Sequence, residues 1–168
     1  ACSGILFNHE SPLRGTEFVT RKITIGLSKI KLGQLDCLEL GNVEAKRDWG
    51  HAADYVVAMY LMLQHNSPDD YVVASNENHS VRDFINLSCD VLDMNIEWED
   101  EGLDKKAINI ATGKTIVKVN PQFYRPTEVD VLLGDSSKAR KILQWKPETS
   151  FNDLVSMMVK SDYDKLSK

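Results

Sequence analysis

Three polar segments of the sequence carry the residue types that bind anionic ligands. They cover residues 8–14, 46–51 and 125–128. Two arginines that converge on one pyrophosphate would each contribute charge-assisted hydrogen bonds of about 1.5–3 kcal/mol. The segments together therefore indicate a site for a nucleotide diphosphate. Each holds one arginine near a proline or an aromatic residue that would restrict it, and these are Arg14, Arg47 and Arg125.

Each segment also has a purely structural interpretation. Residues 46–51 could be a solvated turn in which Trp49 anchors in the core and Asp48 caps the following helix, and this is the better interpretation if the segment is taken alone. In the third segment, Pro126 could stiffen a loop and Glu128 could stand near a helix start. An isolated histidine such as His9 more often completes a core. Residues 8–14, however, follow a predicted strand, and ligands of open α/β folds gather at the carboxyl ends of strands.

The sequence lacks the common short motifs for nucleotide-binding loops, serine hydrolases and metal sites. It contains no GxGxxG, Walker or GxSxG motif, and its four histidines show no HxxxH or HExxH spacing. We therefore predict no metal site. The three cysteines form no CxxC pair and cannot all pair within one chain, which is typical of a reducing compartment and favours the cytoplasm. They are Cys2, Cys37 and Cys89.

Composition excludes further classes of function. The 168 residues are 42% hydrophobic and 27% charged, as in ordinary globular proteins, and carry a net charge of -5. A nucleic-acid surface would have to oppose this average field, so we expect no nucleic-acid binding. The longest apolar stretch, residues 55–63, is too short to span a membrane, and no basic leader precedes an apolar run at the N-terminus.

Hydrophobic periodicity and turn residues predict alternating strands and helices. We expect a polar loop at residues 41–50, a charged connection between the last two strands, and a proline-restricted loop at 120–128. Ser80 and Asp83 resemble a capping box. Helices are predicted at residues 17–31, 51–63, 80–92, 136–143 and 151–165, and strands at 4–7, 38–40, 71–74, 96–98 and 115–119.

This alternation is typical of an α/β protein with parallel pairing. The first strand appears at once, without a preceding helix, and a parallel edge needs partners for its ladder groups and its faces. We therefore expect residues before Ala1 to supply the rest of the sheet. Without them, apolar surface would be exposed around Ile5, Phe7, Val72 and Val73.

Several long runs closely resemble the GDP-mannose 4,6-dehydratases, which belong to the extended short-chain dehydrogenase/reductase family. The likeness extends over nearly the whole chain. The runs Lys-Arg-Asp-Trp-Gly-His and Tyr-Arg-Pro-Thr-Glu are much more specific than any short motif. The matching segments are residues 4–12, 18–23, 40–51, 79–82, 124–130, 133–135 and 145–147.

The resemblance implies that residues 1–168 are the C-terminal, nucleotide-sugar-binding portion of a Rossmann-like enzyme. This portion would contain the last parallel strands and the smaller substrate lobe. In that family NADP takes hydride from C4 of the mannose of GDP-mannose, water is lost across C5 and C6, and the hydride returns to C6. The product is GDP-4-keto-6-deoxymannose, a precursor of GDP-fucose. Members are usually homodimers or homotetramers.

Residue by residue, the resemblance implies two sets of contacts. His9 and Arg14 match positions that contact NADP. Leu13 stands where the family commonly has arginine, so one charge of this loop is missing. The family's glycine-rich loop, its Thr and Glu pair and its Tyr-x-x-x-Lys motif would precede Ala1, so we assign no catalytic residue here and expect the chain alone to be inactive. The residues that match or line the GDP-mannose site are Asn8, Val19, Lys22, Gly41, Arg47, Arg125 and Glu128.

Two alternatives stay open. A related nucleotide-sugar epimerase or another sugar-nucleotide dehydratase would use the same pair of arginines. A non-catalytic nucleotide-sugar-binding module derived from this fold would share the binding residues and lack the chemistry.

Overall fold

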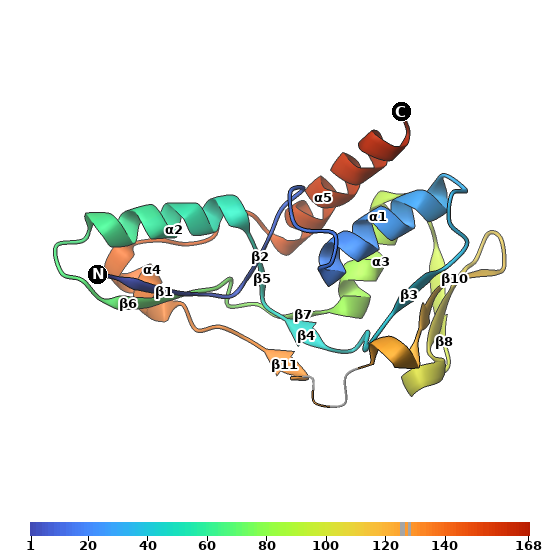
Figure 1. The fold of residues 1–168 in the computed structure, drawn as a ribbon, viewed down its shortest axis with the longest axis horizontal. Helices are drawn as coiled ribbons and strands as arrows, with labels where there is room; N and C mark the ends of the chain where they lie inside the picture. The colour runs from blue at the N-terminus through green and yellow to red at the C-terminus, as the bar shows by residue number, and fades with distance from the viewer. Residues whose placement is uncertain (125–126, 128) are drawn as a thin grey trace.

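Two hydrophobic clusters organise the molecule. The computed structural model describes residues 1–124, 127 and 129–168, and these residues form the elongated molecule of Figure 1. The cluster that contains Ile23, Phe84 and Met158 fills what we call the large lobe. The cluster around Tyr55 and Trp145 fills the small lobe, which includes the N-terminus.

The large lobe packs three helices against a four-stranded sheet. The helices contact one another and are α1 (Val19–Lys31), α3 (Val81–Val91) and α5 (Phe151–Leu166). The strands are β3 (Leu38–Leu40), β8 (Ile96–Glu99), β9 (Lys106–Asn109) and β10 (Lys114–Val119). Their order is β3-β10-β9-β8, with β3 and β10 parallel and the other neighbours antiparallel. A short 3-10 helix, η1 (Gly102–Asp104), joins β8 to β9.

Local sequence explains how two of these helices begin and end. In α1, Ile23 and Leu27 are fully buried one turn apart, and Gly33 ends the helix with a positive φ of 70°. In α3, the hydroxyl oxygen of Ser80 accepts from the backbone N–H of Asp83, whose carboxylate accepts from the backbone N–H of Ser80. The predicted capping box is therefore confirmed.

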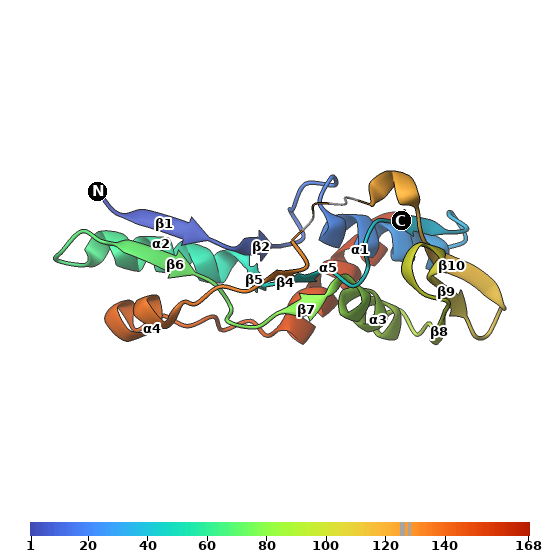
Figure 2. The same cartoon turned by 90° about the horizontal axis from the view of Figure 1, so that it is seen from below.

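The small lobe is built on a parallel pair of strands. Strand β1 (Ser3–Leu6) pairs with β6 (Asp70–Val73), and helices α2 (Ala52–Gln64) and α4 (Ser137–Leu143) complete the lobe. The two helices contact each other as well as β6, and Figure 2 shows α4 alongside this strand. The buried side chains between them include Tyr55, Met62, Tyr71 and Trp145.

Short strands link the two lobes. Strand β2 (Asn8–Glu10) runs parallel to β5 (Trp49–His51). A second small sheet has the order β11-β4-β7, and it lies between the lobes in Figure 1. Its strands are β4 (Lys46–Arg47), β7 (His79–Ser80) and β11 (Val131–Leu132). A further 3-10 helix, η2 (Pro121–Phe123), follows β10.

The predicted α/β class with parallel pairing is confirmed, and all five predicted helices are present within one to two residues of their expected ends. The predicted loop at residues 41–50 is wrong in part because it contains β4 and most of β5. The charged connection before β10 contains the additional strand β9. These strands are short, and their pairing with distant segments, rather than any local periodicity, makes them strands.

The predicted role of Asp48 is also wrong. This carboxylate is fully buried and does not cap α2, which begins after His51 without a side-chain cap. It accepts instead from the backbone N–H groups of Ser75, Asn76 and Gly134. Asp48 therefore joins β5 to the segments that follow β6 and β11. Trp49, as predicted, is buried in the core of the large lobe.

The exposure of the strand pair in the small lobe agrees with the prediction only in part. Ile5 on β1 is 55% exposed, as expected, whereas Val73 on the neighbouring strand is fully buried. Helix α2 is apolar around most of its circumference, so not all of its apolar side chains can be buried. Tyr55 and Met62 are buried, but Val56, Met59 and Leu63 are exposed.

None of the helices in the described part of the chain combines the length and apolar character of a membrane span. Within the same residues, no group of three or more His, Cys, Asp or Glu side chains is placed to hold a metal ion. All three cysteines are free thiols. Cys89 is buried in the large lobe, which raises the pKa of its thiol to about 12.

Candidate functional site

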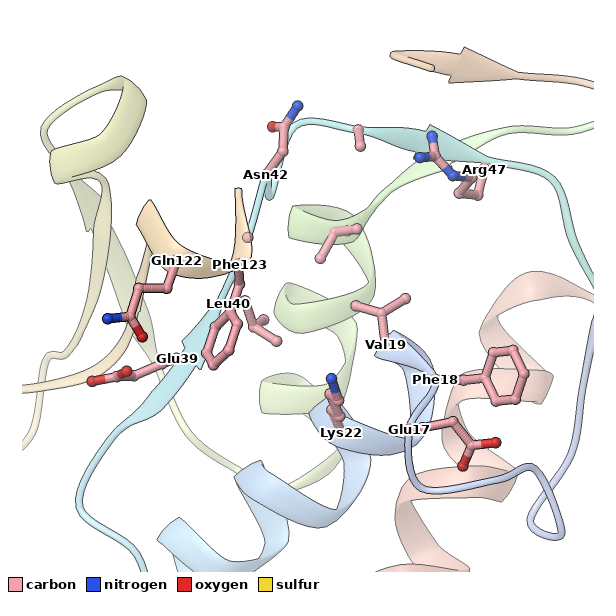
Figure 3. A pocket seen from close by; sticks show the side chains of 13 residues that line it. Glu17, Phe18, Val19, Lys22, Glu39, Leu40, Asn42, Arg47, Gln122 and Phe123 are labelled. Carbon is pink, nitrogen blue, oxygen red and sulfur yellow. The ribbon is translucent and has the colours of Figure 1, made fainter. Parts of the chain in front are cut away.

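A cavity of about 590 Å³ opens where α1, β3, β4 and η2 meet, and Figure 3 shows the side chains around it. Four residues predicted from the sequence line this cavity. They come from three separate parts of the chain, so the fold brings them together. They are Val19, Lys22, Gly41 and Arg47.

Helix α1 supplies one wall of the cavity. Val19 is its first residue, and Lys22 stands one turn later on the same face. The ammonium nitrogen of Lys22 lies 6.0 Å from the centre of the Phe123 ring, which comes from η2 on the opposite wall. A positive charge and a flat apolar surface therefore face the same space.

Gly41 allows η2 to approach β3 closely. A Cβ atom at this position would overlap the backbone carbonyl oxygen of Phe123. The neighbouring backbone contact is a hydrogen bond from the N–H of Asn120 to the carbonyl of Leu40, 2.8 Å long. Gly41 therefore determines where the Phe123 ring lies in the cavity.

Arg47 lies across the cavity from Lys22. Its Nη1 donates to the carbonyl oxygens of Lys46, at 2.8 Å, and of Val129, at 2.6 Å. The N–H of Lys46 also donates to the carbonyl of Asp130. These bonds hold the guanidinium against the segment that leads into β11.

Two predicted substrate residues, Arg125 and Glu128, lie outside the described residues. The expected convergence of Arg47 and Arg125 on one diphosphate therefore stays a prediction.

The other three predicted residues lie on β2 and the loop that follows it and do not line the cavity, although Arg14 stacks on Phe18, which does. The side-chain amide of Asn8 donates to the carbonyl of Asp48 at 3.2 Å. Nδ1 of His9 lies 2.9 Å from the carbonyl oxygen of Phe7, and the His9 ring is 5.4 Å from the Tyr55 ring. The structure does not bring these residues into the cavity that holds Lys22 and Arg47.

Arg14 is held on two sides. Its guanidinium lies 3.5 Å from the centre of the Phe18 ring, and its Nε lies 3.3 Å from a carboxylate oxygen of Glu10. The Nε contact is an ion pair without hydrogen-bond geometry. Glu10 is almost fully buried, and this burial raises the pKa of its carboxyl group. The hydrogen bond from Thr20 and the charges of Arg14 and His9 act in the opposite direction.

The cavity residues that sequence reasoning missed include Phe123, Glu39 and Asn42. The carboxylate of Glu39 accepts from Lys118 at 2.8 Å and from the side-chain amide of Asn120 at 2.6 Å. These hydrogen bonds lower the pKa of Glu39, which is therefore an anion at neutral pH. A clue for Glu39 was present, because it alternates with two buried leucines on β3 and must point to the other face.

The arrangement suits a ligand that is anionic in one part and flat or apolar in another. Lys22 and Arg47 provide cations that pair with phosphate oxygens, the arginine through a planar fork of donors. Val19, Leu40 and Phe123 provide apolar contact. The cavity volume falls in the range of small-molecule and cofactor sites.

Solved structures share this fold at low sequence identity. The protein RMD from Pseudomonas aeruginosa, complexed with NADPH, superimposes with a TM-score of 0.78 and 19% identity over 96% of this chain and 48% of that one. A dTDP-glucose 4,6-dehydratase from Bacillus anthracis, in complex with NAD, gives 0.72 and 15% over 96% and 44%. A UDP-glucose 4-epimerase from Thermotoga maritima gives 0.67 and 17% over 98% and 45%. These likenesses confirm the predicted fold of the extended short-chain dehydrogenase/reductases.

Curated relatives match at much higher identity. GDP-mannose 4,6 dehydratase of Drosophila melanogaster is 52% identical over 168 residues, which are 100% of this chain and 42% of the relative. The Dictyostelium discoideum and human proteins of the same name are 53% and 52% identical, over 98% of this chain and 46% and 44% of their own lengths. The chain thus spans less than half the length of these relatives. Because the family model described as GDP-mannose 4,6 dehydratase matches residues 1–158, the chain belongs to the GDP-mannose 4,6-dehydratase family.

Proposed function

We propose that the polypeptide containing this chain is an NADP-dependent GDP-mannose 4,6-dehydratase, and that residues 1–168 form its nucleotide-sugar-binding portion. The reaction converts GDP-mannose to GDP-4-keto-6-deoxymannose. The observation that carries the proposal is one cavity in which Lys22, Arg47 and Phe123 face the same space. Family membership gives the identity of the nucleotide sugar.

Different cavity residues contact different parts of the ligand. Lys22 and Arg47 bind the diphosphate, because charge-assisted hydrogen bonds to phosphate are the strongest contacts these side chains can make. Arg125 binds the same diphosphate, and Glu128 accepts hydrogen bonds from hydroxyl groups of the ribose or sugar. Val19 and Gly41 line the same cavity, whereas Asn8 lies on β2 outside it and is assigned to the nucleotide sugar by family resemblance alone.

The loop after β2 contributes to the cofactor site. Within the described residues, the terminal Nη1 and Nη2 groups of Arg14 make no hydrogen bond, while Phe18 and Glu10 hold the rest of the guanidinium. A fork that is held in this way and is free to donate fits a phosphate oxygen of NADP, and His9 lies on the preceding strand, β2. Arg14 and His9 would hold NADP, and the bound cofactor would supply reversible hydride transfer with C4 and C6 of the sugar.

The proposal includes a cytoplasmic homo-oligomer, dimer or tetramer, of the full-length polypeptide. Light scattering of the purified polypeptide measures its mass. A monomer at micromolar concentration would contradict this part alone.

Calorimetric titration of GDP-mannose tests the binding role of the cavity. We expect the Arg47→Gln variant to bind about ten- to a hundredfold more weakly, the equivalent of about 1.4–2.8 kcal/mol. Arg82→Gln is the matched control, because Arg82 is a partly exposed arginine that pairs with Glu44 at 3.5 Å and does not line the cavity. The control should bind within about twofold of the original protein, since exposed pairs contribute little.

Competing nucleotide sugars separate the dehydratase from its relatives. UDP-glucose and dTDP-glucose are titrated under the same conditions, and we expect GDP-mannose to bind at least about tenfold more tightly than either. Incubation of the full-length polypeptide with GDP-mannose and NADP should then yield the 4-keto-6-deoxy product. Tight binding without product would instead support a non-catalytic nucleotide-sugar-binding module.

A further inference from the structure

Arg21 is a buried arginine of α1 that belongs to neither of the two proposed binding sites. Its side chain is 9% exposed, and it makes three hydrogen bonds to two parts of the chain. Nη1 donates to the carbonyl oxygens of Pro12, at 2.6 Å, and Arg14, at 2.9 Å. Nη2 donates to the carboxylate of Asp162 on α5 at 2.9 Å. A single guanidinium thus joins α1 to the loop that carries Arg14 and to the last helix.

Asp162 fixes Arg21 from the opposite side. It is 2% exposed, and its second carboxylate oxygen accepts from the hydroxyl of Thr24 at 2.6 Å. In a buried ion pair of this kind, the attraction between the charges and their hydrogen bonds offset the loss of hydration on burial. Because both carboxylate oxygens have partners, the position of the Arg21 guanidinium is fixed by α1 and α5 together.

The side chain of Arg14 is held separately from its backbone. Glu10 accepts from the hydroxyl of Thr20 at 2.6 Å and forms the ion pair with Arg14 Nε, and Phe18 stacks on the guanidinium. Arg21 holds the backbone of the same residue. Backbone and side chain of Arg14 are thus fixed by different groups, which leaves its terminal NH₂ groups in one place.

We propose that Arg21 and Asp162 are positioning residues that hold the backbone at Pro12 and Arg14, so that the Arg14 guanidinium meets a dinucleotide phosphate. This inference rests on the proposed function, because it assumes that Arg14 contacts the cofactor. Lysine cannot replace Arg21, since one ammonium group lacks the planar fork that reaches both carbonyls and the carboxylate. Lys22, the next residue of α1, lines the other site, so GDP binding provides the comparison for NADPH binding.

The test uses the full-length polypeptide and measures NADPH and GDP binding separately, for the original protein and for Arg21→Lys. We expect NADPH to bind about tenfold more weakly to the variant, while GDP binding stays within about twofold. Arg140→Lys is the matched control. Arg140 is another partly buried arginine, whose Nη2 donates to the carbonyl of Ser75 and whose Nε donates to the hydroxyl of Ser136, far from the Arg14 loop. It should change neither affinity.

A second variant guards against a folding defect. Asp162→Asn keeps the shape and an oxygen acceptor for Arg21 but removes the charge, and we expect a smaller, about threefold, loss of NADPH affinity. If Arg21→Lys does not fold, this variant decides. Unchanged NADPH binding, or an equal loss of NADPH and GDP binding, would overturn the inference. An original protein that binds NADPH but no GDP-mannose would contradict the proposed function instead.

Discussion

The ammonium group of Lys22 and the ring of Phe123 face each other across the cavity, with 6.0 Å between the nitrogen and the ring centre. One comes from the first turn of α1 and the other from η2, and Gly41 sets the approach of η2. A nucleotide that enters between them meets a cation on one side and an aromatic surface on the other. This pairing gives the cavity its two kinds of contact.

Removal of the charge of Lys22 should weaken nucleotide binding. We expect Lys22→Met to reduce the affinity for GDP about tenfold, because the apolar stem remains and one phosphate contact is lost. Lys29→Met, on the same helix but outside the cavity, is the control and should bind normally. Isothermal titration measures both. Equal affinities of the two variants would exclude a phosphate contact at Lys22.

A methyl group at position 41 should displace η2. In Gly41→Ala the added Cβ overlaps the carbonyl of Phe123, so we expect a loss of about 1–3 kcal/mol in the free energy of unfolding, together with weaker GDP binding. Gly15→Ala is the control, because there a Cβ meets only the flexible carboxylate of Glu17. Urea denaturation and GDP titration measure the two effects. Full stability and affinity in Gly41→Ala would show that η2 moves freely.

The stability contributed by Glu10 should depend on pH in a defined direction. Burial raises the pKa of Glu10 above 4.5, so the folded protein holds the proton more tightly than the unfolded chain. This contribution is complete below the unfolded pKa and is lost as pH rises through the folded pKa. We therefore expect the free energy of unfolding of the original protein, minus that of Glu10→Gln, to decrease between about pH 4 and pH 7.

Urea denaturation of both proteins at the two pH values measures this difference. Glu39→Gln, at a position where hydrogen bonds lower the pKa, is the comparison. For Glu39 the sign reverses, because its contribution is present above the unfolded pKa and is lost as pH falls through the folded pKa. A difference for Glu10 that grows with pH would contradict the assigned burial.

How far the sequence predicts this fold depends on whether the signal is local. Helix α1 and the cap of α3 follow from apolar spacing and from two neighbouring side chains, and both were predicted. Strand β4 has two residues, so it exists only through its pairing with β7 and β11. Asp48 was misassigned for the same reason, since its partners are distant in sequence.

The same distinction between sequence signals and tertiary contacts applies to the candidate site. Lys22 and Arg47 were predicted because long motifs of the family contain them, and the fold places both on one cavity. Phe123 was missed because an aromatic residue in a loop usually packs into the core, and only the tertiary structure shows that this residue is 52% exposed and lies beside Lys22. The deep position of Arg21 between two loop carbonyls and α5 also has no local signature.

A structure of the full-length polypeptide with GDP-mannose tests the central claim most directly. The quantity to measure is the distance from the diphosphate oxygens to the guanidinium of Arg47 and the ammonium group of Lys22. We predict hydrogen-bond distances, up to about 3.2 Å, to both groups, with the ligand in the cavity beside Phe123. A diphosphate bound outside this cavity, out of reach of both side chains, would contradict the account.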